Sequence, residues 1–338
     1  MQRSRLYLLV IVGLFLSGCQ PKASGTQEPN QAIPTATEIK IINTKCVTET
    51  VCPRVTLSIT LNSPEAEPPQ YNLINCDETV CQVEWTGILD RPITEGNRNT
   101  IALAYPYAST RDGTLPPHHG VEFPNPSGTP VLAAAPGNVE YAGSDDLKLL
   151  GPYTGFYGNV VILKHEGLFE ERDVFTLYAH LSAIDVEVGE TVKSGDKLGE
   201  VGASGAADGS HLHFEVRLDE NAYAQTINPI LWFTPVSMPD NERASMLAGS
   251  IVKRNGDLIS EFELSLEKYG LDGSIEERHY LKTYVSYDMN AHPIFNENFA
   301  LTDIPAGDYR LAFVYGSLYE YFFHLEPGSL GYMVIQLD

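Results

Sequence analysis

The chain has 338 residues, of which 43% are apolar and 20% charged, so it is long enough for two or three domains and apolar enough to fold. Its formal net charge of −22 would repel nucleic-acid phosphates, which excludes a nucleic-acid partner. The 18 tyrosines, 28 glycines and 22 prolines favour many short strands and turns.

The first residues have the pattern of an export signal. Arg3 and Arg5 precede an apolar run over residues 6–16, which is shorter than the roughly 20 residues that span a bilayer. The run ends in Leu-Ser-Gly ahead of Cys19, which resembles the lipobox of bacterial lipoproteins. We expect residues 1–18 to be a lipoprotein signal peptide and Cys19 to carry the lipid, with an ordinary secretory signal as the alternative. The protein would then be extracytoplasmic, anchored by lipid to the membrane of the cell envelope.

The segment after the signal changes character twice. Residues 19–37 are rich in Pro, Ser, Thr, Gly and Gln and poor in apolar groups, which predicts a disordered tether. Residues 55–61 then alternate apolar and polar side chains with a period of two, as a half-buried strand does. Residues 71–75, 82–85 and 100–104 continue this pattern. We interpret residues 38–105 as a small antiparallel β domain.

Four cysteines lie in this predicted N-terminal domain: Cys46, Cys52, Cys76 and Cys81. An exported chain meets an oxidising environment, so an even set indicates two disulfides. Three pairings are possible, and we favour Cys46–Cys52 with Cys76–Cys81 because each would close a short local turn. A zinc site built from the four is a weaker alternative, because their spacings are wide.

Histidines gather in the middle of the chain. Six of the nine lie between residues 118 and 213, at positions 118, 119, 165, 180, 211 and 213. Residues 210–218 alternate polar and apolar side chains, which predicts a strand with His211 and His213 on one face. Residues 175–181 alternate similarly and place His180 on the polar side of a second strand.

His118 and Glu122 are four residues apart, which aligns them on one face of an extended segment. Two histidines and a carboxylate can supply the three ligands of an open catalytic zinc site. Zinc would lower the pKa of its water to about 7 and polarise a carbonyl. The remaining histidines could act as a base and as donors to an oxyanion.

The last part of the chain, residues 245–338, predicts a C-terminal β-sandwich. An Asn-Gly-Asp turn at residues 255–257 and a Pro-Ala-Gly-Asp-Tyr corner at residues 305–309 separate strand-like stretches. This segment is similar to the prealbumin-like modules that are called carboxypeptidase-regulatory-like. The resemblance implies a role in packing or adhesion rather than in chemistry.

The middle segment, residues 106–236, resembles the M23 family of metallopeptidases, the lysostaphin and LytM type. The family's motifs occur in the family's order. They are His-His-Gly-Val-Glu at 118–122, Gly-Thr-Pro-Val at 128–131 with Ala133, Tyr-Gly-Asn-Val-Val at 157–161, Tyr-Ala-His-Leu at 178–181, the glycine-spaced valines of 186–195, and Gly-Ser-His-Leu-His-Phe-Glu-Val at 209–216. The resemblance implies an antiparallel β core for this segment. Together with the two smaller β domains that flank it, we expect an all-β chain.

The resemblance also implies roles for single residues. His118 and His213 match zinc ligands, and Glu122 stands where the family has aspartate. His180 and His211 match the two catalytic histidines. The implied activity is that of a zinc endopeptidase that cuts peptide bonds in peptidoglycan stems or cross-bridges. Glutamate keeps the carboxylate but adds a methylene, so we expect the backbone or the zinc to shift to preserve the ligand distance.

Two other functions fit parts of the sequence. A catalytically inactive relative could bind the wall or activate another hydrolase, although such relatives typically lose ligands and all four histidines are present here. A lipoyl- or biotin-type carrier would explain the hairpin-like spacing of valines and glycines in residues 186–195. However, Lys193 and Lys197 lack the context of a carrier lysine, and a carrier leaves the histidines unexplained.

Overall fold

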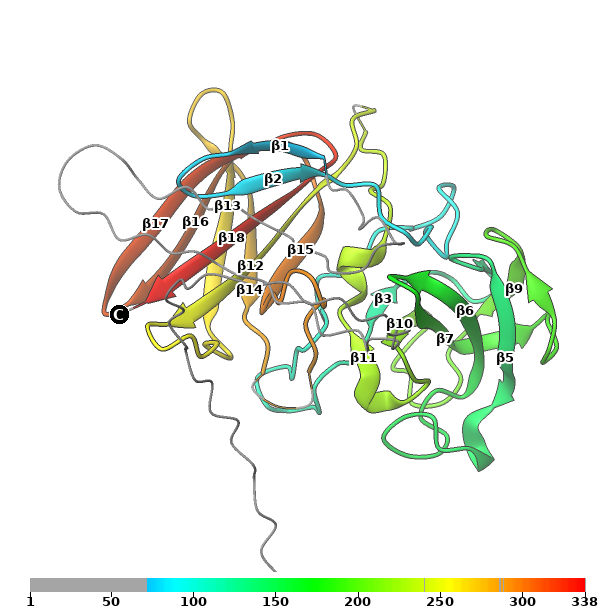
Figure 1. Cartoon of the computed structure of the whole chain (residues 1–338). Coiled ribbons are helices and arrows are strands. Elements are labelled where there is room, and N and C mark those ends of the chain that lie inside the picture. Colours follow the sequence, from blue (N-terminus) through cyan, green and yellow to red (C-terminus); the bar gives the residue numbers. More distant parts are fainter. Residues whose placement is uncertain (1–71, 240, 286, 288, 338) are drawn as a thin grey trace, which may run out of the picture.

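The computed structural model describes residues 72–337 except positions 240, 286 and 288. Strands dominate the described residues and pair into three sheets (Figure 1). The expectation of an all-β chain with a mainly antiparallel core is thereby confirmed. The signal peptide, Cys19, the tether and the pair Cys46 and Cys52 lie outside the described residues.

The large sheet contains β3 to β11 and occupies the right half of Figure 1. Its order is β11-β10-β7-β6-β5-β8, with β3 paired to β10 and β9 paired to both β4 and β7. All of these pairs are antiparallel. The bounds are β3 (Val121–Phe123), β4 (Pro130–Leu132), β5 (Gly137–Ser144), β6 (Asn159–Phe169), β7 (Arg172–Ile184), β8 (Thr191–Val192), β9 (Lys197–Val201), β10 (Leu212–Leu218) and β11 (Thr226–Ile227).

Two further sheets form the other half of the molecule. The mixed sheet has the order β1-β2-β18-β12-β15, in which β12 and β18 run parallel, and the small sheet has the order β14-β13-β16-β17. Their bounds are β1 (Leu73–Cys76), β2 (Cys81–Glu84), β12 (Ser245–Lys253), β13 (Glu263–Tyr269), β14 (Ile275–Lys282), β15 (Phe299–Ile304), β16 (Gly307–Tyr315), β17 (Ser317–Leu325) and β18 (Ser329–Leu337).

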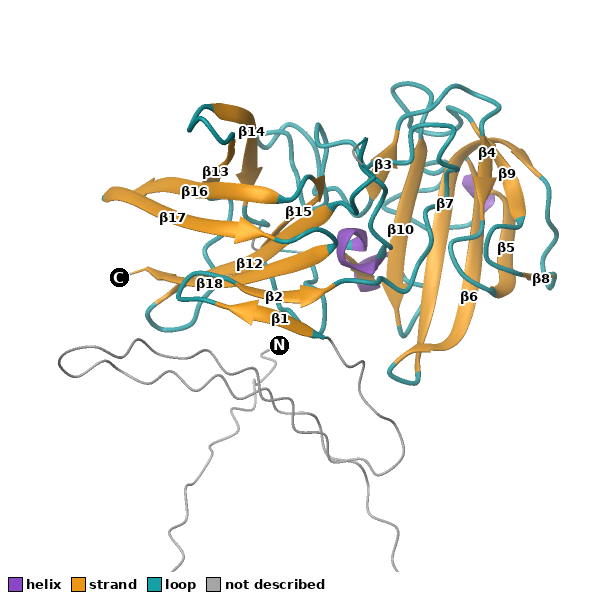
Figure 2. Ribbon diagram, turned by 90° about the horizontal axis from the view of Figure 1, so that it is seen from above, coloured by secondary structure: helices purple, strands orange, loops and turns teal. Residues whose placement is uncertain are grey.

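The mixed and small sheets stack face to face (Figure 2). Inward side chains of both sheets form one buried cluster, to which Leu247 and Ile335 contribute from the mixed sheet and Leu266 and Leu311 from the small sheet. Alternation along each strand supplies this face, because every second side chain points inward.

A second buried cluster joins the mixed sheet to the large sheet. Phe214 of β10 and Trp232 belong to the same cluster as Met246 of β12 and Leu330 of β18. Because apolar burial stabilises by roughly 25 cal/mol per Å², this shared core fixes the two halves against each other.

The N-terminal cysteines and strands differ in part from the expectation. Cys76 and Cys81 form the predicted disulfide and close the β1–β2 hairpin. This hairpin pairs with β18 and so belongs to the mixed sheet. The strand expected at residues 100–104 is not formed, because this segment bonds elsewhere: the amide of Ile101 donates to the Asp303 carboxylate at 3.0 Å.

Helical structure in the described residues is confined to short 3-10 turns: η1 (Asp145–Leu147), η2 (Tyr223–Gln225) and η3 (Pro229–Trp232). The η3 turn contacts both β10 and β15. Over the same residues we find no helix with the length and apolar character needed to cross a bilayer.

Candidate metal and catalytic site

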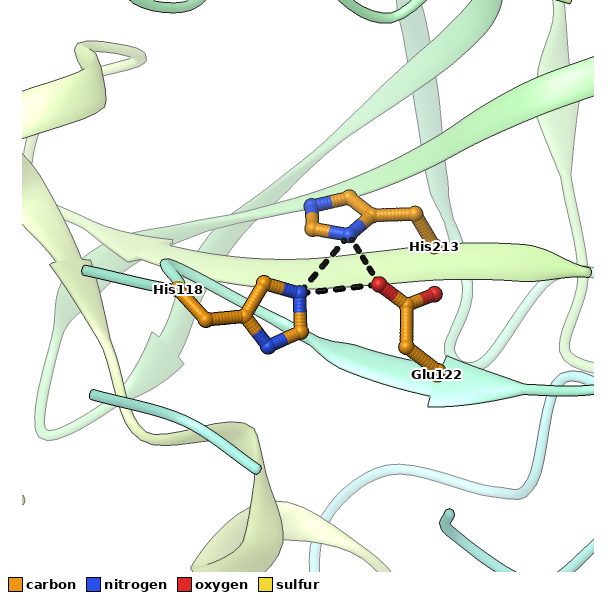
Figure 3. Close-up of side chains that lie close together, drawn as sticks. All are labelled: His118, Glu122 and His213. Carbon is orange, nitrogen blue, oxygen red and sulfur yellow. Dashed lines mark hydrogen bonds and ion pairs between the residues drawn. The ribbon is translucent and has the colours of Figure 1, made fainter. Parts of the chain in front are cut away.

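Three side chains converge on one point at the end of β10 (Figure 3). Nε2 of His118 lies 2.9 Å from Oε1 of Glu122 and 3.3 Å from Nδ1 of His213. Nδ1 of His213 lies 3.1 Å from the same Glu122 oxygen. Two imidazole nitrogens and a carboxylate oxygen thus form a nearly equilateral triangle.

Strand pairing explains how Glu122 and His213 meet. They stand directly opposite each other where β3 pairs with β10, and directly opposite side chains share one face of a sheet. Gly120 lies against the same strand. A Cβ at Gly120 would stand 2.6 Å from both Cε1 of His213 and the carbonyl oxygen of Phe214, so only glycine allows this close approach.

His118 comes from the segment that precedes β3. Its amide donates to the carbonyl of Ser109 at 3.0 Å, and its carbonyl accepts from the amide of Ala108 at 2.8 Å. The Tyr105 ring stacks on its imidazole with centroids 4.0 Å apart and planes inclined by 16°. Residues 105–109 therefore hold both the backbone and the ring of His118.

In His118 and His213, one ring nitrogen faces the centre of the triangle and the other, outer nitrogen faces away from it. The hydrogen bonds of the outer nitrogens determine which nitrogen faces the centre. Nδ1 of His118 lies 3.3 Å from the carbonyl oxygen of Pro106, and Nε2 of His213 lies 3.1 Å from Oε1 of Glu215. A carbonyl or carboxylate oxygen only accepts, so each of these nitrogens carries the proton. When neutral, each ring then turns a lone pair toward Glu122, as metal-binding histidines do.

The Glu215 carboxylate behind His213 is itself fully buried and bonded. Nε of Arg217 donates to its Oε2 at 2.9 Å, and the Tyr157 hydroxyl donates to its Oε1. Burial alone would raise the pKa of the Glu215 carboxyl, but Arg217 and His213 outweigh it and hold that pKa well below its usual range. Glu215 is therefore a permanent anion beside His213.

The electrostatics of the triangle favour a cation at its centre. Burial alone would lower the pKa of His213, but the carboxylates of Glu122 and Glu215 outweigh it and raise that pKa to about 9. Burial alone would raise the pKa of Glu122, yet the surrounding histidines hold it well below its usual range. The site thus retains an anionic ligand and attracts positive charge.

The donor set fits a zinc ion. Tetrahedral zinc with ligands at about 2.0–2.1 Å separates neighbouring ligand atoms by about 3.3 Å. The separations of 2.9, 3.1 and 3.3 Å in the triangle are close to this value. Glu122 reaches this position by its own side chain, with its backbone still in regular register with β10. The residues can thus supply three ligands and leave a fourth position for water.

Two more histidines border the triangle. The His180 ring centroid lies 5.6 Å from that of His213 and 4.9 Å from that of His211. His180 has φ of 62°, a left-handed conformation that costs a non-glycine residue about 1–3 kcal/mol. Its Nδ1 lies 2.8 Å from the carbonyl oxygen of Ser204, so Nε2 is the free nitrogen. Burial lowers the pKa of His180 to about 4.

His211 differs from His180 because both of its ring nitrogens, rather than one, face oxygen atoms. Its Nδ1 lies 2.9 Å from the carbonyl oxygen of Gly209, and its Nε2 lies 3.0 Å from Oε2 of Glu122. Burial alone would lower the pKa of His211, but the Glu122 carboxylate outweighs it and raises that pKa. The Gly209 carbonyl and the Glu122 carboxylate can only accept a proton, so His211 presents an N–H at Nε2.

The structure brings all five residues singled out from the sequence into one cluster: His118, Glu122, His180, His211 and His213. The adjacent residues His119 and Tyr178 instead make packing contacts and hydrogen bonds away from the triangle. His119 is buried and stacks on Tyr223 with centroids 3.8 Å apart. Tyr178 is buried in the core, where its hydroxyl accepts from the amide of Ala134 at 2.8 Å.

Sequence reasoning missed two supporting residues. Glu215 had a usable signal, because it follows His211 and His213 at the same two-residue interval and so shares their face of the strand. Tyr105 had none. It lies 13 positions before His118, in a segment without strand structure, and only the fold brings the two rings together.

Residues 116–229 match the family model described as Peptidase family M23. The chain contains a peptidase M23 domain. The DD-carboxypeptidase/endopeptidase Mpg of Neisseria meningitidis serogroup B is 34% identical to this chain over 142 residues, which are 42% of this chain and 28% of that protein. The peptidoglycan DD-endopeptidase ShyB of Vibrio cholerae is 33% identical over 136 residues, 40% of this chain and 28% of ShyB.

A third relative is an uncharacterized lipoprotein, YgeR of Escherichia coli. It is 35% identical over 130 residues, which are 38% of this chain and 43% of YgeR. The chain thus spans less than half the length of each of these three relatives. The segment that matches the M23 family model includes every residue of the cluster from His118 to His213.

Proposed function

We propose that the protein is a zinc-dependent endopeptidase that hydrolyses peptide bonds in peptidoglycan stems or cross-bridges. The single observation that carries this proposal is the triangle of His118, Glu122 and His213, bordered by His180 and His211. Support for the substrate comes from the relatives, of which ShyB is named a peptidoglycan DD-endopeptidase.

The chemistry divides between the metal ligands and the two bordering histidines. A zinc ion held by His118, Glu122 and His213 would polarise the scissile carbonyl and lower the pKa of its water to about 7. His180 is neutral at pH 7 because its pKa is about 4, so its Nε2 can take a proton from the attacking water. His211 offers its Nε2–H to the oxygen that becomes negative.

The location and the flanking parts belong to the same proposal. Lipidation at Cys19 would hold the enzyme at the membrane of the cell envelope, with residues 19–37 as the tether. The name of YgeR as a lipoprotein supports this arrangement. The M23 domain would then work within residues 106–236, beside an N-terminal β segment (38–105) and a C-terminal sandwich (245–338) of the prealbumin-like kind.

An inactive, wall-binding M23 protein is the alternative. The geometry favours the enzyme, because each of the four histidines has its outer nitrogen held by a carbonyl or carboxylate. Such ordering of both the ligands and the bordering histidines is what catalysis requires.

Two measurements on the purified full chain test the proposal. Elemental analysis should find one zinc per chain. Digestion of defined peptidoglycan fragments should give products whose masses identify one cleaved peptide bond. A chain that binds no stoichiometric zinc contradicts the proposal, and a chain that binds zinc but releases no product supports the inactive alternative.

A further inference from the structure

A cleft of about 770 Å³ lies between the segment of residues 101–112 and the small sheet. One wall is the segment that leads to His118, with Pro106 and Ser109 among its residues. The opposite wall is β14, which is an edge strand of the small sheet. The matched M23 segment begins at residue 116, so most of this cleft is formed outside it.

The strand presents its edge to the cleft. All five residues from Arg278 to Lys282 line it, although their side chains alternate between the two faces of the sheet. Both faces can border one cleft only along the strand's edge. Among the described residues β14 pairs with β13 alone, so every second residue turns its N–H and C=O toward the cleft, where an added strand can bond to them.

The wall opposite β14 is continuous with the metal site. The carbonyl of Pro106 accepts from Nδ1 of His118, and the backbone of residues 108–109 bonds to the backbone of His118 in both directions. A chain that extends along this wall therefore leads from the cleft toward the ligands.

The charge of the cleft differs from that of the whole chain. The protein has 44 acidic and 22 basic residues, whereas the lining includes the basic Arg111, Arg278 and Lys282 and the acidic Asp112 and Glu263. Arg278 is held by the buried Glu267 at 2.7 Å, and Arg111 lies 3.8 Å from the exposed Asp208. Nζ of Lys282 pairs with Asp112 at 2.8 Å and with Glu263 at 3.8 Å, and both acids are more than four-fifths exposed. Exposed pairs are weak, so an incoming carboxylate can replace them.

We propose that this cleft binds an extended, carboxylate-bearing part of the peptide substrate as an additional strand along β14. Main-chain hydrogen bonds would supply affinity, and Lys282 would select the carboxylate, as in other cases of strand addition. The inference rests on the proposed peptidase function, because it assigns the occupant to the substrate of the same site.

Binding is tested without catalysis, on the full chain in the presence of a zinc chelator. The probe is a fluorescein-labelled decapeptide of alternating glutamate and alanine, followed by fluorescence anisotropy. We expect Lys282→Glu to weaken binding at least tenfold. Lys253→Glu makes the same charge change at the exposed end of β12, and should alter binding less than twofold.

A second pair of probes tests strand pairing itself. Two versions of the decapeptide carry N-methyl groups on alternate amides, one on the odd and one on the even residues. An added strand bonds through only one set of amides, so one version should bind and the other should lose at least tenfold in affinity. Equal binding of the two versions, or equal binding by Lys282→Glu and the wild type, overturns the proposal.

The same chain separates this inference from the proposed function. A zinc-loaded wild type that cleaves peptidoglycan fragments but does not bind the decapeptide overturns the cleft alone. A wild type that binds the decapeptide in one N-methyl phase but cleaves nothing supports the cleft as a peptide site and rejects the peptidase function.

Discussion

Oε1 of Glu215 lies 3.1 Å from Nε2 of His213, on the side of the ring away from Glu122. The proton on Nε2 leaves Nδ1 as the nitrogen that faces His118 and Glu122. A fully buried residue outside the triangle of His118, Glu122 and His213 thus sets which nitrogen of His213 faces Glu122.

Glu215→Gln should therefore weaken zinc binding by about 10–100-fold, as loss of a partner behind a metal ligand does. The glutamine amide can donate to Nε2 and reverse the tautomer, and it leaves Arg217 without its buried counter-charge. Competition with a coloured chelator measures the affinity, and circular dichroism checks the fold. Zinc affinity equal to that of the wild type would show that Glu215 serves the fold only.

His180→Ala and His211→Ala should each lower turnover by about 10²–10⁴-fold, the usual contribution of an acid–base group. Each variant should retain one zinc, because neither residue belongs to the ligand triangle. His324→Ala provides the control, since this histidine lies on the exposed face of β17 and pairs with Asp308. Loss of zinc from either variant would move that histidine into the ligand set.

Substitutions at Glu122 test whether this carboxylate, one methylene longer than aspartate, is a metal ligand. Glu122→Asp should retain stoichiometric zinc and peptidase activity, because the shorter residue is the one that the resembling family uses at this position. Glu122→Ala should lose the metal, since it removes the one anion of the triangle. Elemental analysis of both variants decides the point, and a zinc-replete Glu122→Ala chain would contradict it.

Glu297 predicts a pH dependence of stability away from the metal site. Burial raises the pKa of this carboxyl from 4.5 to about 7, so the folded state holds its proton more tightly than the unfolded state. Its contribution to stability is complete below pH 4.5 and is lost as the pH rises through about 7. Relative to Glu297→Gln, the wild type should lose about 2 kcal/mol of unfolding free energy between pH 5 and pH 7.5, at 1.36 kcal/mol per pKa unit.

Urea unfolding of the wild type and Glu297→Gln at pH 5 and pH 7.5 measures this difference. The comparison between the two proteins removes the contributions of other titrating groups, including the buried His292. A difference in the free energy of unfolding that stays constant between the two pH values would show that Glu297 ionises normally.

The sequence predicted those parts of the site that depend on local periodicity. The alternation around His211 and His213 placed both on one face, and both imidazoles contact the Glu122 carboxylate. The same alternation gives this strand one polar face, yet every residue of β10 is buried. Glu215 and Arg217 neutralise each other there, and a periodicity of apolar residues does not reveal such a pair.

Long-range contacts account for what the sequence did not predict. The β1–β2 hairpin pairs with β18, about 250 positions later in the chain, and no pattern within either segment identifies the other. The path of residues 100–117 is likewise set by long-range contacts. This segment has no regular structure of its own, and bonds to residues distant in sequence set its path.

Tyr107 sits in that segment, one residue from the carbonyl that orients His118. Its hydroxyl lies 3.0 Å from the carbonyl oxygens of Thr226 and Asn290 and accepts from the amide of Asn290 at 3.2 Å. The segment that orients His118 is therefore bonded to a loop of the C-terminal half. A protein shortened to residues 116–229, the segment that matches the family model, would lack Tyr107 and Pro106 and with them the contacts that hold His118 in place.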